Sequence, residues 1–377
     1  MGRRNRRKIE LSQLKFLSYA AFLIAFLITF AILAKVILVP LAFAAIIAVQ
    51  MSPVSSYLER KGLNRFWSIF LSIIGLVMVV SSLLVGISMM FTNVYENLPL
   101  VKSDLENGVD VLLNKVSNFT NIPKETLSGY TEVDGGSWAG SVFNVIEVIL
   151  SNSIGTLTSV SLALLFCFFF LLYRSGIKYI LLYKRSAKEK GKWKELIKKL
   201  KNMIQGYING LFIISVLIGT LNSLSLWIIG IDYPFFWGYL GGLLIIIPYI
   251  GTLVGGLLPF IYALATTSTL WQPVSIIIFY ALIQQLEGNF ITPKIIGDKI
   301  NVNPFAVIIA MLSGGLIWGI AGVILAIPIV GVLKILLLKY KSTYKIAYLL
   351  SGDLYDLEHV IPEKENHQGA DLSASEG

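Results

Sequence analysis

The side chains most able to do chemistry lie in one polar stretch, residues 284–304, within an otherwise apolar half of the chain. Five charged residues occur between positions 203 and 333, and four of them fall in this stretch. The four are Glu287, Lys294, Asp298 and Lys299. An ionisable group at membrane depth is costly and commonly marks an ion pathway or a proton relay. Glu287 ends an apolar run, so we expect its carboxylate to exchange a proton or to bind a cation or a substrate hydroxyl.

The same stretch contains residues that interrupt helices. Gly288, Pro293 and Gly297 should break the helix that ends at Glu287, and the lipid core tolerates such backbone only where it lines a cavity or a protein interior. Two other Gly/Pro segments, 248–251 and 328–331, predict broken helices whose free carbonyl and amide groups contribute to the same ligand site. The predicted pathway residues are Glu287, Gln284, Asn289, Pro293, Asp298, Pro248, Gly251, Pro328 and Gly331.

A structural role for the carboxylate is the alternative. Glu287 would then form an ion pair with Lys294 or Lys299 and fix a packed hairpin, because intramembrane charges commonly pair with one another.

The composition indicates a polytopic α-helical membrane protein. Of the 377 residues, 55% are hydrophobic and only 14% are charged, whereas soluble domains carry about 25% charged residues. Several apolar runs exceed the ~18 residues that suggest a spanning helix. The net charge of +9 does not point to nucleic acid, because the basic residues fall in loops that should face the cytoplasm.

Several classes of protein are disfavoured by what the chain lacks. The single cysteine, Cys167, lies in an apolar run, so no disulfide can form within the chain and a packing role is expected. Both histidines, His359 and His367, are in the polar tail. No HExxH, GxSxG or P-loop motif occurs. We therefore predict no enzymatic activity, no metal site, no cofactor and no ATP-driven step.

Six to eight membrane segments are predicted, some of them re-entrant hairpins, together with a small helical outer segment. The predicted crossings are residues 16–34, 36–57, 67–90, 146–173, 205–229 and 272–287, with Lys35 as an outer turn. The predicted regions are helices in 1–90, an outer segment in 91–145, a fourth span in 146–173, a basic cytoplasmic helix in 174–202, a transport core in 203–340 and a cytoplasmic, partly disordered tail in 341–377.

The Lys-rich segment 184–201 has apolar residues at helical spacing. This pattern is typical of a helix that lies in the membrane interface, with Trp193, Leu196 and Leu200 facing the bilayer. Two interpretations remain open for it, a topology anchor and a regulatory lipid sensor.

The second half of the chain contains a repeat. A Trp-Gly, a second Gly and a Pro-x-x-Gly recur in residues 237–251 and 318–331. Residues 235–265 are too long for one straight crossing and are divided at 248–251, which predicts a re-entrant hairpin from outside. Residues 304–338 would form a second hairpin from inside, which makes the repeats inverted. In the competing eight-span arrangement, residues 289–303 lie outside and the repeats are parallel.

Four stretches together resemble the bacterial autoinducer-2 exporter family. They are VPLAFAAIIAVQMSPVSSYLERKG, IIIPYIG, QQLEGNFITPKIIGDKINVNP and GGLIWGIAGVILAIPIVGVLK. The resemblance covers about residues 16–339. The sequence departs from the family pattern at Thr252, where a proline is common, and near Phe43 and Ala44, where a glycine is common.

The resemblance implies a homo-oligomeric transporter, a pentamer, in the bacterial cytoplasmic membrane. Both termini should be cytoplasmic, and the partners are membrane lipid and a small polar solute or a monovalent cation and proton. Family members are associated with export of the furanone signal autoinducer-2, and others with sodium (or lithium)/proton antiport. One carboxylate can serve either activity, so both stay open, with a non-transporting membrane scaffold as a third hypothesis.

Overall fold

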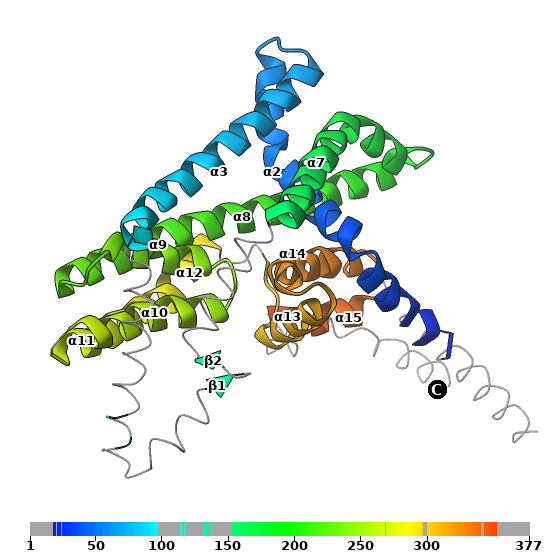
Figure 1. The fold of residues 1–377 in the computed structure, drawn as a ribbon. Coiled ribbons are helices and arrows are strands. Elements are labelled where there is room, and N and C mark those ends of the chain that lie inside the picture. The colour runs from blue at the N-terminus through cyan, green and yellow to red at the C-terminus, as the bar shows by residue number, and fades with distance from the viewer. Residues whose placement is uncertain are drawn as a thin grey trace, which may run out of the picture.

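The computed structural model describes residues 18–19, 21–23, 25–96, 114, 117, 132–133, 136–137, 153–267, 269–296, 300–340 and 343–352. The chain is an all-α membrane protein, as predicted (Figure 1). The described helices are α2 (Lys35–Arg60), α3 (Arg65–Glu96), α7 (Ser153–Leu182), α8 (Ala187–Ile229), α9 (Pro234–Leu244), α10 (Ile250–Thr266), α11 (Trp271–Leu286), the π-helix η1 (Glu287–Ile291), α12 (Thr292–Ile295), α13 (Pro304–Trp318), α14 (Ile320–Leu337) and α15 (Tyr344–Leu349).

Six helices of the described part are long and apolar enough to cross a membrane. They are Lys35–Arg60, Arg65–Leu83, Leu157–Leu182, Ala187–Ile229, Trp271–Ile295 and Ile320–Leu337. Shorter apolar helices occupy Ala21–Leu33, Gly251–Leu264 and Pro304–Trp318. Most of the predicted outer segment lies outside the described residues, apart from the end of α3 and a pair of antiparallel two-residue strands, β1 (Glu132–Val133) and β2 (Gly136–Ser137).

The predicted turn at Lys35 is wrong. The amide of Ala34 donates to the carbonyl of Phe30 at 2.8 Å, and the amide of Leu38 donates to the carbonyl of Ala34 at 2.9 Å. These two bonds carry the chain from Ala21–Leu33 into α2 without a reversal, although a turn at Ala34 separates the two helices. No glycine, asparagine or proline occurs between positions 30 and 38 to end a helix there, so the basic side chain alone could not make a turn.

Helices α2, α3 and α7 pack into an N-terminal bundle. Ala44, Ile69, Cys167 and Leu171 form its apolar core, and the Cys167 side chain is fully buried, which agrees with the packing role predicted for it. At one end of the bundle, a guanidinium from α7 forms an ion pair with the carboxylate of Glu59 in α2. This bundle is the upper part of Figure 1.

Helix α8 is one continuous helix of 43 residues. It begins at Ser186, whose hydroxyl accepts from the amide of Glu189 while the Glu189 carboxylate accepts from the amide of Ser186. This capping box satisfies two free amides of the first turn. The predicted division between a basic interfacial helix and a separate fifth span is therefore absent from α8, and its Lys-rich turns are the first part of a spanning rod.

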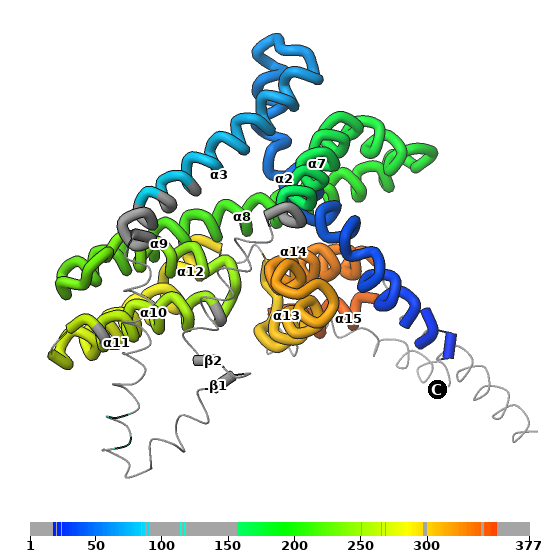
Figure 2. The backbone as a smooth tube through the Cα atoms, in the orientation of Figure 1, coloured from blue at the N-terminus to red at the C-terminus, as the bar shows by residue number. Residues whose placement is uncertain are grey.

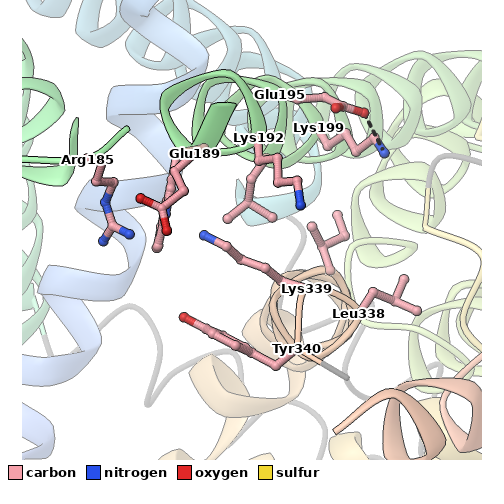
Figure 3. Close-up of a pocket in the computed structure, with 11 residues that line it drawn as sticks. Arg185, Glu189, Lys192, Glu195, Lys199, Leu338, Lys339 and Tyr340 are labelled. Atoms are coloured by element: carbon pink, nitrogen blue, oxygen red, sulfur yellow. Dashed lines mark ion pairs between the residues drawn. The ribbon is translucent and has the colours of Figure 1, made fainter. Parts of the chain in front are cut away.

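The predicted bilayer-facing side of the Lys-rich turns is wrong for Trp193 and Leu196, whereas Leu200 is half-buried and lines an apolar groove. Leu196 is buried, with 8% of its surface exposed, and it shares a 470 Å³ pocket with Leu338 beyond the end of α14. The guanidinium of Arg185 lies 4.2 Å from the Trp193 ring centroid, and the Lys339 ammonium lies over the same ring. Figure 3 shows Lys339 reaching from the end of α14 toward the start of α8. Cation–π contacts thus hold these turns against protein.

Lys339 lies beyond the described end of α14, outside the candidate span. Partial desolvation lowers the pKa of its ammonium below the ordinary lysine value, and the nearby Arg185 guanidinium adds to that effect. The Glu189 carboxylate acts in the opposite direction.

Small residues let α8 and α9 approach closely. A Cβ added at Gly238 would collide with the backbone of Ser223, and one added at Gly242 would lie 2.7 Å from the Cα of Gly219. Gly238 and Gly242 are four residues apart, and so are Gly219 and Ser223, which is the small-xxx-small pattern of tightly packed membrane helices.

Helices α9 and α10 form a hairpin beside α8 (Figure 2). Its two ends lie near Leu226 and Ile231 at one end of α8, and its tip brings Ile245 against Ile214 and Ile218, part of the way along α8. The break between α9 and α10 falls at residues 245–249, so the predicted interruption around Pro248 is confirmed.

Helices α13 and α14 form a second hairpin that reverses at Gly319, whose φ is 63°. The two helices of this hairpin approach each other at Gly314 and Gly322, where an added Cβ would meet the backbone of the opposite helix. The Trp318 indole at the tip donates to the carbonyl of Ala31 at 3.0 Å. Here Trp-Gly is the turn, whereas Trp237-Gly238 lies inside α9. The two sequence repeats therefore occupy different structural positions, and the predicted inverted repeat is wrong.

Candidate functional site

Glu287 stands at a change of helix type inside the candidate span Trp271–Ile295. It is the first residue of the π-helix η1, between α11 and α12. The predicted break is wrong for Gly288 and Pro293, since the backbone stays helical to Ile295, whereas Gly297 lies outside the described residues. The wide π turn shifts the hydrogen-bond register just before Pro293, which has no amide hydrogen to donate, so the proline is accommodated. Single π-helical turns occur frequently at functional sites.

Neutral donors hold both carboxylate oxygens of Glu287. Gln284 Nε2 donates to Oε2 at 2.6 Å, and Thr292 Oγ1 donates to Oε1 at 2.5 Å. The glutamate is half-buried. Thr292 was missed by sequence reasoning, because a threonine five residues further along the chain faces the same side only in a π-helix, not in an α-helix.

The ion pair with Lys294 is not formed. The ion pairs among described residues are Glu59–Arg174 and Glu195–Lys199, and neither involves Glu287. Lys299, the other proposed partner, and Asp298, a predicted pathway residue, lie outside the described residues. The carboxylate thus has hydrogen-bond partners without a described counter-charge.

The other predicted polar residues of this stretch are exposed. Asn289 Nδ2 donates to Gln285 Oε1 at 2.8 Å, so this amide pair is separate from the pair formed by Gln284 and Glu287. Pro293 follows Thr292 directly and is exposed as well. The stretch presents a short polar surface along η1 and the turns on either side of it.

The hairpin tip that contains Pro248 and Gly251 lies near this polar surface. Ile245, at the tip, shares an apolar cluster with Ile283, which is one helical turn before Glu287. A Cβ added at Gly251 would collide with the backbone carbonyl that ends α9, so the tight turn itself requires glycine. The structure therefore brings this predicted segment to the neighbourhood of the carboxylate.

Pro328 and Gly331 do not form a broken helix, contrary to the prediction. Both lie inside α14, which is continuous. A Cβ added at Gly331 would lie 3.1 Å from the Met203 side chain of α8. The glycine is thus used for helix packing, and the proline lines a groove between α14 and the N-terminal bundle.

The end of α12 lies near the middle of α8. A Cβ added at Gly210 would lie 2.8 Å from the Ile296 side chain, and Ile300 lies close to Gly331 beside Met203. Helix α11 therefore runs antiparallel to α8, away from the end at which the α9–α10 hairpin begins.

A buried lysine marks a second polar cluster that sequence reasoning missed. Lys334 in α14 is only 7% exposed, and its ammonium donates to the carbonyl of Asn301 and, at 3.0 Å, to the hydroxyl of Ser351. It is the only charged residue buried among those described. In the sequence, the only feature that could have indicated this cluster is a single lysine at the end of an apolar run. Among the described residues, no group of three metal-ligating side chains occurs.

Comparison with known proteins gives a consistent picture. The model of the "AI-2E family transporter" family matches residues 18–342. The "Putative transport protein YrrI" of Bacillus subtilis is 24% identical over 81% of this chain and 87% of its own length. A "Putative transport protein" of Haemophilus influenzae is 26% identical over 86% and 93%. The "Putative permease PerM" of Escherichia coli is 25% identical over 79% and 86%.

Proposed function

The chain belongs to the AI-2E transporter family, and from that premise we propose that it exports a small polar solute, such as autoinducer-2, along a pathway that passes Glu287. It is a multi-pass membrane protein related to transporters and permeases. The solute, the outward direction and the use of an ion gradient are the proposed parts.

One observation carries the proposal. A half-buried carboxylate inside a candidate span is held by an amide and a hydroxyl and has no ion-pair partner among the described residues. When it is charged, such a carboxylate can accept a hydrogen bond from a hydroxyl of a polar solute. When the carboxylate is protonated, it can release that solute. The neutral donors Gln284 and Thr292 can rotate to follow either state, which a fixed ion pair would resist.

The hairpin tip supplies the second element of the proposed pathway. We infer that α9 and α10 are re-entrant, because both ends of this hairpin lie at one end of α8 and its tip lies part of the way along it. The turn at residues 245–249 leaves backbone groups outside regular helix. Such groups at membrane depth are stable only beside protein or a water-filled cavity.

Antiport of sodium or lithium against protons is the second candidate. The observation that favours it is the oxygen chemistry beside Glu287, where the carboxylate and the Thr292 hydroxyl are within hydrogen-bond distance of each other. Small hard cations prefer such oxygen ligands. A membrane scaffold without transport activity is the remaining alternative.

The proposal is tested by flux measurements on the purified protein in liposomes. We expect outward-directed movement of autoinducer-2 that responds to an imposed pH difference, compared with liposomes that lack protein. Movement of sodium or lithium with protons, and none of the furanone, would favour the antiporter. No flux for any solute or gradient would favour the scaffold.

The orientation of the chain is also a proposal. We place the Lys-rich end of α8 and the C-terminal side of α14 in the cytoplasm by the positive-inside rule, in a bacterial cytoplasmic membrane. The family resemblance further implies a homo-oligomer, a pentamer. The mass of the complex in detergent measures the number of subunits.

Cysteine labelling tests this orientation. Asp232 and Lys294 are both exposed. Asp232 follows the end of α8, whereas Lys294 lies at the other end of the α11–α12 segment, which runs antiparallel to α8. The natural Cys167 is fully buried. In intact cells, a water-soluble reagent should label Asp232→Cys and leave Lys294→Cys unlabelled until the membrane is opened. Labelling of both positions from outside would support the eight-span arrangement, and the reverse pattern would contradict the proposed orientation.

A further inference from the structure

A groove of 810 Å³ lies between α2, α7, α8 and α14. Its walls are mostly apolar, with Ala45, Phe170, Ile204 and Ile329 representing the four helices. The volume falls within the ~300–1,000 Å³ typical of small-molecule sites. None of the residues that line it belongs to α11, η1 or α12, so it is separate from the Glu287 site.

Three cations line the same groove, and no acidic residue does. Arg174 is neutralised by its ion pair with Glu59. Lys201 has a single hydrogen bond in the described structure, to the Ser52 hydroxyl at 3.4 Å, and Lys178 is exposed without a described ion pair. Two positive charges are thus left beside an apolar wall.

We propose that this groove binds one anionic phospholipid, with its phosphate between Lys178 and Lys201 and an acyl chain along the apolar wall. The groove combines two lysines with a long apolar wall. This combination is complementary to an anionic phospholipid and poorly suited to a small polar solute. The Lys-rich turns of α8 adjoin the groove, and anionic lipids of the cytoplasmic leaflet attract basic segments of this kind. The bound lipid would contact α7, α8 and α14 at the same time and so hold these helices together.

Thermal unfolding in detergent with added lipid tests the proposal. We expect phosphatidylglycerol to raise the melting temperature of the wild-type protein more than phosphatidylcholine does. Each lysine near an anionic lipid contributes about a fivefold preference, so the double variant Lys178→Ala with Lys201→Ala should need roughly 30-fold more phosphatidylglycerol for the same rise.

The matched control is Lys194→Ala with Lys198→Ala. These two lysines are exposed on the same helix as Lys201, do not line the groove, and change the net charge equally. The control should keep the wild-type response to phosphatidylglycerol. Equal loss in both double variants, or equal stabilisation by the two lipids, would overturn the proposal, as would full stabilisation by glycerol phosphate without acyl chains.

A steric variant tests the apolar part independently of charge. Ala45 lines the groove and is exposed, so Ala45→Trp should fill the space and abolish the response to phosphatidylglycerol, with the melting temperature in phosphatidylcholine unchanged. An unchanged response would overturn the proposal. A change in the mass of the oligomer instead would show that a second copy of the chain covers the groove, which would overturn it as well.

Discussion

Replacing Glu287 with glutamine should abolish the pH dependence of transport while the protein still folds and assembles. Glutamine keeps the size of the side chain and can accept from Thr292, but it cannot bind or release a proton. A flux controlled by one proton changes by up to about tenfold per pH unit, and the flux of Glu287→Gln should stay flat over the same range. The measurement is flux in liposomes at a series of pH values.

Two further variants make the result specific. Asp232→Asn removes one negative charge from an exposed acid away from the π-helix, and its pH profile should match the wild type. Thr292→Val removes the hydroxyl that donates to Oε1 and leaves the carboxylate, so it should change the rate of transport without abolishing its pH dependence. An unchanged profile in Glu287→Gln would show that the carboxylate is structural.

Replacing Gly251 with alanine should disrupt the tip of the α9–α10 hairpin and reduce both stability and transport. The added Cβ would collide with the carbonyl of Leu244 and lie 3.0 Å from the amide nitrogen of Ile245. Both are backbone atoms, so no side chain can rotate away to relieve the clash. Inserting extra atoms into packed sites typically costs about 1–3 kcal/mol, which melting temperature in detergent would detect.

The matched control is Gly288→Ala, one residue after Glu287. A Cβ there meets no atom within 4 Å, and alanine is favoured over glycine in helices by about 1 kcal/mol. Gly288→Ala should therefore melt at or above the wild-type temperature. If Gly251→Ala melted and transported like the wild type, the tight turn would not be part of the working structure.

Among the predicted site residues, local patterns located the carboxylate, its partner Gln284 and the hairpin tip, but not Thr292. Glu287 stood out as a charge at membrane depth, and Pro248–Gly251 divided a segment too long for one crossing. Thr292 joined the site only because a π-helix changed the spacing. Pro328 and Gly331 matched the same Pro-x-x-Gly pattern and yet lie in a continuous helix, where Gly331 packs against Met203 and Pro328 lines a groove.

The sequence by itself determined that the chain is an all-α membrane protein, which family it resembles, and where its apolar helices run. Apolar length and the spacing of charges are enough for that, because every spanning backbone must satisfy its own hydrogen bonds. Tertiary structure decided which faces are covered. Trp193 and Leu196 read as bilayer-facing and instead pack against the end of α14, since lipid and protein interiors are equally apolar and a sequence pattern cannot distinguish them. The predicted reversal at Lys35 also depended on tertiary structure, because the bonds from Ala34 to Phe30 and from Leu38 to Ala34 carry the chain across a local turn without reversing it.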